Sequence, residues 1–364
     1  MKFRCERDVL VEALGTAGRA VSGRGGMLPV LSGVRAELVG GTLTLTGSDL
    51  DLTISVGASV TGQEDGATVL PAKLASDIVR ALPAGAVTVE VGEDEARIVA
   101  DRSEFTLRVT PADEYPKLNP ADAEPVQLDA AELAKALRQV TPAASTDDNR
   151  PIITGVLLSA EEGGLRLVAT DSYRLAVRDI AGLSVLSGRS SVLVPSRALR
   201  EVERLLGSAE SVTLRLGERD AAFEVGTCRI TTRLIEGEFP NYRGLIPSSY
   251  PNRLVVGREP LLDAIRRVRL LARDATPVRL VMKPDGLELL AVTQDVGQAH
   301  EELDAKYEGA ELTVAFNPEY LAQGVEVTSG DEVVLETIDA LKPAVLRGTE
   351  SPDFLYLLMP VRVS

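Results

Sequence analysis

The sequence contains one pattern three times, at intervals of about 120 residues, and this repetition limits the fold more than any other feature. The segments GSDLDLTISV, ATDSYRLAV and VTQDVGQAH place Asp49, Asp171 and Asp295 at matching positions. A later series of prolines closes each unit, at Pro116, Pro240 and Pro360. Solenoid repeats are much shorter, at roughly 20–45 residues. The period therefore predicts three tandem copies of one domain, over residues 1–120, 121–247 and 248–364.

Length and composition agree with three separate cores. A chain of 364 residues allows two to four domains of about 100–200 residues. Hydrophobic residues make up 45% of it, without any tryptophan, so the cores must consist mainly of Val, Leu, Ile and Ala. The two cysteines, Cys5 and Cys228, lie in different repeats, which argues against a disulfide framework. With no apolar leader and no long apolar run, the sequence predicts a soluble cytoplasmic protein.

Each repeat contains two helical patterns, one at its start and one near its middle. Apolar residues recur at helical spacing, as in Leu133, Leu137 and Val140. A proline at or just before the start of each later helix supplies a fixed φ that suits a first turn. The expected helices are 7–21, 72–82, 129–141, 196–206, 259–273 and 318–325.

The segments between these helices alternate apolar and polar residues, which is typical of strands with one buried face. Examples are AVTVEVGED from Ala86 and SVTLRLGER from Ser211. Turns rich in glycine or acidic residues separate them. Each repeat therefore predicts an α+β unit in which helices cover one face of an antiparallel sheet.

The net charge of −15 ordinarily argues against nucleic acid as a partner. The six helical segments, however, carry thirteen basic and ten acidic residues, while the whole chain carries 39 basic and 54 acidic ones. The helices are therefore mildly basic and the remainder is strongly acidic. A charged helix face is often only a solvated one, so this separation matters only if the helices share one surface.

Motifs for catalysis or for metal binding are scarce. His300 is the only histidine, which excludes His-rich metal sites and makes a Ser-His-Asp triad improbable. There is no phosphate loop, no CxxC and no HExxH motif. Asp49 with Asp51, or Asp147 with Asp148, could act as acid/base pairs, although acidic surface turns explain them more simply. A hydrolase that uses such a pair and a β-rich adhesion protein remain as alternatives.

Six strings in order give the chain a resemblance to the bacterial DNA polymerase III β subunit, the sliding clamp family. They are MKFRCERDVL, LPVLSGV, ATDSYRLAV, EGEFPNYRGLIP, AFNPEYL and YLLMPVRV, and together they cover all three repeats. The resemblance implies a DNA clamp fold in which two chains join head to tail and close a six-domain ring around duplex DNA. It implies no catalysis, no cofactor and no metal. The replicative polymerase α subunit, the clamp loader and other DNA enzymes would dock through short peptide motifs.

The resemblance also implies a peptide groove between the second and third domains. Its apolar members would form a pocket for a leucine or aromatic anchor, and its polar members would fix the orientation of the peptide. Carried over residue by residue, the groove comprises Ile153, Thr170, Ser172, Tyr173, Arg174, Leu175, Pro240, Leu245, Asn317, Tyr320, Leu341, Pro343, Leu357, Leu358, Met359, Pro360, Val361 and Arg362.

DNA would meet basic residues of the helices and adjoining loops through sequence-independent phosphate contacts. The expected DNA-facing residues are Arg24, Lys73, Arg80, Lys135, Arg138, Arg150, Arg197 and Arg204. For the dimer seam the sequence suggests apolar residues, Ile78 and Phe105 on one side and Leu270 and Leu271 on the other.

The sequence departs from the commoner family pattern at several positions. Ser172 and Tyr173 replace a frequent Gly-His pair, and Gly244 stands where some members have a basic residue. Pro151 and Ile152 replace tyrosines that some members offer to DNA, which leaves Arg150 as the expected contact there. The helix expected at 318–325 has no basic residue, so the charge of the helices is not uniform.

Overall fold

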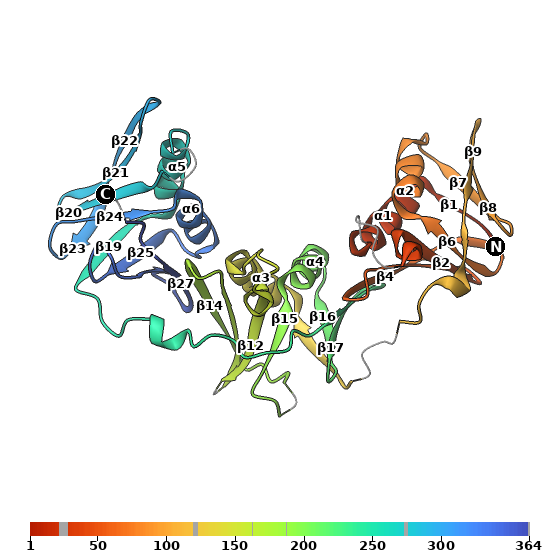
Figure 1. Ribbon diagram of the computed structural model, residues 1–364, viewed down its shortest axis with the longest axis horizontal. Helices are drawn as coiled ribbons and strands as arrows, with labels where there is room; N and C mark the ends of the chain where they lie inside the picture. The colour runs from red at the N-terminus through yellow and green to blue at the C-terminus, as the bar shows by residue number, and fades with distance from the viewer. Residues whose placement is uncertain (22–27, 119–122, 162, 187, 273–275, 363–364) are drawn as a thin grey trace. The chain divides into compact units, whose positions relative to one another are not determined.

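The computed structural model describes residues 1–21, 28–118, 123–161, 163–186, 188–272 and 276–362. It divides into two compact units, Met1–Ala131 with Arg204–Leu234, and Glu132–Glu203 with Ile235–Ser364. The division falls inside the second repeat, because the strands of that repeat belong to two different sheets. The predicted α+β class with antiparallel sheets is confirmed, and the elements are labelled in Figure 1.

The first unit holds two sheets whose neighbouring strands are all antiparallel. The smaller sheet has the order β5 (Thr61–Glu64), β1 (Lys2–Glu6), β7 (Ala86–Val91), β8 (Glu95–Ala100) and β9 (Ser103–Arg108). The larger sheet has the order β10 (Thr110–Pro111), β6 (Gly66–Pro71), β2 (Gly33–Val39), β3 (Thr42–Ser48), β4 (Leu52–Ser59), β18 (Cys228–Arg233), β17 (Asp220–Val225), β16 (Ser211–Leu216) and β11 (Pro125–Asp129). Its β4–β18 pairing joins the first repeat to the second.

The second unit repeats this design. Its larger sheet has the order β15 (Ser191–Pro195), β12 (Gly155–Glu161), β13 (Gly164–Thr170), β14 (Arg174–Ala181), β27 (Ser351–Leu358), β26 (Ala344–Gly348), β25 (Glu332–Thr337), β19 (Asn252–Gly257) and β23 (Ala305–Glu308). Its smaller sheet has the order β22 (Gly297–Leu303), β21 (Gly286–Thr293), β20 (Val278–Lys283) and β24 (Leu312–Phe316). The β14–β27 pairing joins the second repeat to the third.

Six α-helices lie within the described residues, close to the predicted ranges. They are α1 (Arg7–Ala17), α2 (Ala72–Ala81), α3 (Ala130–Val140), α4 (Ser196–Leu206), α5 (Arg258–Arg269) and α6 (Pro318–Val327). Helix α5 ends before the expected residue 273, and residues 273–275 lie outside the described part. Helix α1 packs on α2, and α5 packs on α6 (Figure 1). None of the described helices is long and apolar enough to cross a bilayer.

Aliphatic side chains form the cores, as the composition predicts. In the first unit, Leu14 of α1 and Val79 of α2 pack with Phe3 of β1 and Leu45 of β3. In the second unit, the connector that follows β18 lies against the larger sheet, where Phe239 and Tyr242 cover Leu175 and Leu355. This connector links the second repeat to the third, so its packing fixes the path of the chain beside the candidate site.

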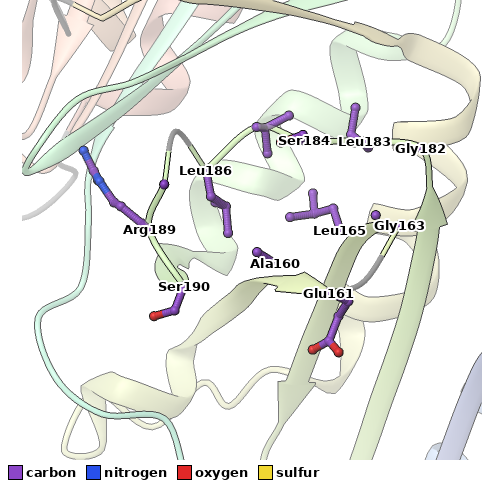
Figure 2. A pocket seen from close by; sticks show the side chains of 13 residues that line it. Ala160, Glu161, Gly163, Leu165, Gly182, Leu183, Ser184, Leu186, Arg189 and Ser190 are labelled. Carbon is purple, nitrogen blue, oxygen red and sulfur yellow. The ribbon is translucent and has the colours of Figure 1, made fainter.

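A separate cavity of about 530 Å³ lies at the turn between β12 and β13. Figure 2 shows Leu165 and Leu186 pointing into it, with Glu161 and Arg189 at its margins. None of the residues predicted for the groove, for DNA or for the dimer seam lines this cavity. The cavity is therefore not the site that the sequence predicts.

Candidate functional site

A tight turn between β13 and β14 positions the residues that the second repeat contributes to the site. The carboxylate Oδ1 of Asp171 accepts hydrogen bonds from the backbone N–H groups of Tyr173 (2.9 Å) and Arg174 (3.0 Å). Ser172 adopts the left-handed conformation with φ of 80°. An aspartate that accepts from the backbone two and three residues later stabilises such a turn. The turn leaves Tyr173 exposed and directs Arg174 inward.

The first repeat builds the same turn around Asp49. Its Oδ1 accepts from the N–H groups of Asp51 (3.1 Å) and Leu52 (2.8 Å), and Leu50 has φ of 78°. The third repeat differs, because Asp295 itself has positive φ. Two of the three aspartates that mark the sequence repeat are therefore turn-forming residues with one shared geometry.

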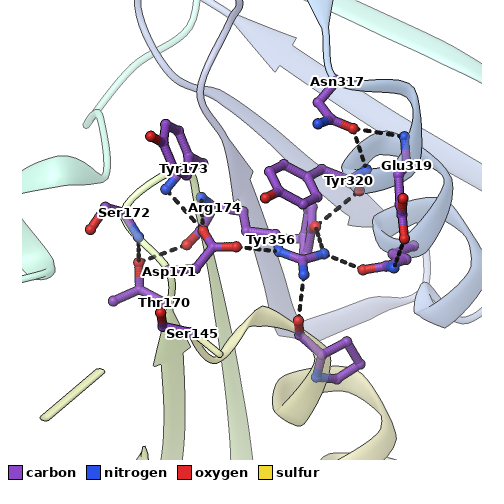
Figure 3. Close-up of polar contacts among 12 residues, drawn as sticks. Ser145, Thr170, Asp171, Ser172, Tyr173, Arg174, Asn317, Glu319, Tyr320 and Tyr356 are labelled. Atoms are coloured by element: carbon purple, nitrogen blue, oxygen red, sulfur yellow. Dashed lines mark hydrogen bonds and ion pairs between the residues drawn. The ribbon is translucent and has the colours of Figure 1, made fainter. Parts of the chain in front are cut away.

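Arg174 is the centre of a polar network that joins four segments, namely its own turn, the segment at Pro142, α6 and β27 (Figure 3). Its Nε donates to Asp171 (3.0 Å), and its Nη2 donates to the carbonyl of Pro142 (2.5 Å). Its Nη1 donates to Gln323 of α6 and to the hydroxyl of Tyr356 (3.3 Å) on β27. The side chain is 8% exposed. Each of its nitrogens thus has a partner inside the protein, and the guanidinium holds the turn, α6 and β27 together.

The third repeat contributes an aromatic ring to this network. Asn317 caps α6 by accepting hydrogen bonds from the N–H groups of Glu319 and Tyr320. The cap fixes the first turn of the helix. Tyr320 then lies 4.2 Å from the Arg174 guanidinium, a cation–π distance, and its ring centroid is 6.5 Å from that of Tyr173.

The chain's last strand runs directly beside the turn. Arg174 pairs with Leu358, and the N–H of Met359 donates to the carbonyl of Tyr173 (2.9 Å). Two residues later the N–H of Val361 donates to Ala315 (2.8 Å), the penultimate residue of β24. The structure thus brings the predicted groups 170–175, 317–320 and 357–361 together, although more than 140 residues separate the first of them from the others.

The predicted groove residues divide into buried supports and exposed contacts. Six are buried, namely Ile153, Thr170, Arg174, Leu175, Leu357 and Leu358. The exposed apolar side chains include Tyr173 (61%), Leu245 (51%), Leu341 (65%) and Met359 (37%). Pro240, Ser172 and Arg362 are also exposed, and Pro343, Pro360, Val361, Asn317 and Tyr320 are half-buried. Leu175 belongs to the core beneath the connector, so we expect it to support the site rather than contact a ligand.

Burial shapes the acid–base properties of the network. Burial raises the pKa of Tyr356 to about 12, so its hydroxyl stays protonated. Burial alone would lower the pKa of Arg174, but Tyr356 and Asp171 favour its charged form and the net direction is upward. The network is therefore a permanently charged support. Sequence reasoning missed Gln323, Tyr356 and Pro142, since only the folded chain places them around Arg174.

Most of the predicted DNA-facing residues are accessible side chains on helices. Lys73 and Arg80 of α2, and Arg197 and Arg204 of α4, are exposed and lie two turns apart, which places each pair on one helix face. Arg138 of α3 is exposed and pairs with Glu203 (3.5 Å), while Lys135 is half-buried. Arg150 donates to Asp147 (2.9 Å) and to Ser172 (3.1 Å), and Arg24 lies outside the described residues.

The residues predicted for the dimer seam lie beside two sheet edges. Strand β9, which carries Phe105, ends the smaller sheet of the first unit, and β22 ends that of the second. Phe105 is 40% exposed and Leu270 is 78% exposed, whereas Ile78 and Leu271 are half-buried. Each side thus presents an exposed apolar residue near an edge strand of the described sheets, a combination that favours association.

Comparison with known proteins gives one consistent result. Models of the N-terminal, central and C-terminal domains of the DNA polymerase III beta subunit match residues 1–119, 127–241 and 243–362. Beta sliding clamps from Streptomyces coelicolor and Synechococcus elongatus are 35% and 34% identical, with all of both chains covered. Solved sliding clamps from Bartonella birtlesii, bound to griselimycin, and from Bacillus subtilis are 32% and 31% identical over all of both chains, with TM-scores of 0.93 and 0.91.

Proposed function

Because the chain belongs to the DNA polymerase III beta subunit family, we propose that it is a sliding clamp that encircles duplex DNA. It is a processivity subunit without catalysis of its own, and it tethers the replicative polymerase to its template. Neither the hydrolase nor the adhesion alternative has support from the family match.

The observation that carries this proposal is the site around Arg174. Exposed Tyr173 and Met359 lie on neighbouring segments joined by a backbone hydrogen bond, and buried Arg174 with half-buried Tyr320 holds those segments in place. A few exposed apolar residues on a rigid polar support suit a short peptide with an apolar anchor. We propose that this surface, with Leu245 and Leu341, receives the clamp-binding motifs of the polymerase, the clamp loader and other DNA enzymes.

The rest of the assembly follows from the same proposal. Each chain would contribute three domains, 1–120, 121–247 and 248–364. Two chains would join head to tail and close a ring of six domains. The exposed basic residues of α2, α3 and α4 would contact phosphates without reading bases, so the ring slides. The acidic remainder of the chain would keep DNA from other surfaces. This role places the protein in the cytoplasm, where the chromosome is replicated.

The experiment that tests the proposal is fluorescence-anisotropy binding of a labelled peptide of the Gln-Leu-x-Leu-Phe type. We expect a micromolar dissociation constant, about −8 kcal/mol, for the unmodified chain. Tyr173→Ala with Met359→Ala should weaken binding by tenfold or more, since truncated anchor residues commonly cost more than about 1 kcal/mol each. We choose Tyr173 rather than Leu175 because Leu175 is buried, and its loss would disturb the core.

Val39→Ala provides the matched control, because Val39 is as exposed as the site residues but lies on β2 of the first unit. It should bind the peptide like the unmodified chain. Absence of binding by the folded unmodified chain, or equal loss in the control, would refute the proposed peptide site.

A further inference from the structure

Three potential metal ligands converge on the exposed face of the smaller sheet in the second unit. Within the described residues, Glu288 of β21 and His300 and Glu302 of β22 bring one ligand atom each to within 4.8 Å of the others. In the strand register Glu288 lies directly opposite Glu302, and His300 lies opposite Leu290. Because side chains alternate along a strand, all three ligands lie on one face, while Glu301 points to the other and pairs with Arg267 of α5.

The spacing of the ligand atoms suits a small divalent cation. The Nε2 of His300 lies 3.6 Å from an oxygen of Glu288 and 3.7 Å from an oxygen of Glu302. These separations are too long for hydrogen bonds. A tetrahedral zinc site with bonds of about 2.0–2.2 Å places its ligand atoms roughly 3.4 Å apart. The two His300–Glu separations are within a few tenths of an ångström of that spacing. All three ligand atoms lie within 4.8 Å of one another, so movement of the exposed side chains can bring them around one ion.

The electrostatics of this face also favour a cation. Like charges directly opposite each other on neighbouring strands destabilise a sheet, and Glu288 and Glu302 form such a pair. Lys283 of β20 donates to one oxygen of Glu288 (2.6 Å). The other oxygen faces His300, so Lys283 orients the carboxylate and leaves a ligand atom available. The half-buried Glu288 anchors the cluster, and the two exposed ligands on β22 can adjust to it.

We propose that Glu288, His300 and Glu302 form a binding site for a borderline divalent metal ion of the zinc class. An imidazole with two carboxylates suits such ions better than magnesium or calcium, which prefer oxygen ligands alone. Water would complete the coordination, since only three protein ligands converge. The proposed site departs from the expectation of no metal. None of its residues belongs to the predicted peptide, DNA or dimer sets, although His300 and Glu302 lie on β22, the edge strand beside the predicted seam.

The test is a titration of the full-length, tag-free protein with zinc, followed by calorimetry and by proton NMR. His300 is the only histidine, so one imidazole signal reports on the site without assignment. We expect one zinc ion per chain and a shift of that signal. His300→Gln and Glu302→Gln should each weaken zinc binding by about tenfold or more, and acidification should weaken it too, because protons compete for metal ligands.

Glu301→Gln is the matched control, because this carboxylate lies on the same strand but on the opposite face. It should bind zinc like the unmodified chain. A second control, Cys5→Ser with Cys228→Ser, removes the thiols and should also leave binding unchanged. Failure of the unmodified chain to bind zinc, equal binding by His300→Gln, or loss of binding in either control would overturn the proposal.

Discussion

At the scale of single residues, Arg174 has a different role from the one that its sequence position indicates. The sequence suggests a polar residue at the edge of the groove. The structure shows a buried guanidinium whose nitrogens donate to four partners and which lies against the ring of Tyr320. Arg174 is therefore a positioning residue, and only the planar fork of arginine matches this set of acceptors.

Arg174→Lys should weaken peptide binding by about tenfold or more, although the charge is kept, because lysine cannot reach all the acceptors. The anisotropy assay measures this, and thermal unfolding should show a loss of stability as well. Arg35→Lys, at a surface pair with Glu37 (2.7 Å), should change neither quantity appreciably. If Arg174→Lys binds the peptide as tightly as the unmodified chain does, the network does not shape the site.

The two cysteines give a prediction about pH. Burial raises the pKa of each thiol from 9.0 to about 11. Because these folded pKa values lie above the unfolded one, the resulting stability is present below pH 9 and is lost as the pH rises toward 11. At pH 8.5 iodoacetamide should alkylate both thiols far more slowly in the folded protein than in urea. Equal rates in the two states would contradict the stated burial.

At the scale of elements, α6 packs closely against β27. Its face toward β27 meets the ring of Tyr356, and Gly324 allows that approach. A Cβ at Gly324 would lie 2.6 Å from two ring carbons of Tyr356. The same ring donates its hydroxyl proton to the carbonyl of Tyr320 (2.9 Å). Through these contacts, helix α6 supports the Arg174 network.

Gly324→Ala should therefore destabilise the protein and weaken peptide binding, although alanine normally stabilises a helix interior by about 0.5–1 kcal/mol over glycine. Urea unfolding measures the change in the free energy of unfolding. Gly15→Ala in α1 is the matched control, because nothing lies within 4 Å of its Cβ, and it should stabilise the chain. If both variants stabilise the protein, the contact of α6 with Tyr356 does not exclude a side chain at residue 324.

At the scale of the whole molecule, the exposed apolar residues near sheet edges indicate a dimer. The native mass should be twice the 38.7 kDa of the chain. Leu270→Glu places a charge at an apolar position that is 78% exposed and should yield monomers, as measured by analytical ultracentrifugation. Val39→Glu, at a similarly exposed valine of β2, should remain dimeric. A monomeric unmodified chain at micromolar concentration would refute the ring.

The basic helices belong to the same scale, because they act only together. Arg197→Glu with Arg204→Glu should reduce DNA-dependent processivity and leave peptide binding intact, since phosphate attraction is lost while the Arg174 site is untouched. Arg219→Glu with Arg253→Glu makes the same change of net charge at exposed positions outside the helices and should preserve processivity. Loss of both activities in the first variant would show that the two surfaces are misplaced.

Periodicity and short strings are local properties of a chain, so the threefold repeat, the six helices, the α+β class and the family could all be predicted from the sequence. It also named Tyr173, Tyr320 and Met359 for the site. The sequence did not predict that Gln323, Pro142 and Tyr356 enclose Arg174 or that Leu175 is a core residue. Nor did it predict that Glu288 and His300 share one face with Glu302. The physical reason is that strand pairing joins segments distant in sequence, such as β14 and β27, and local patterns do not encode their partners.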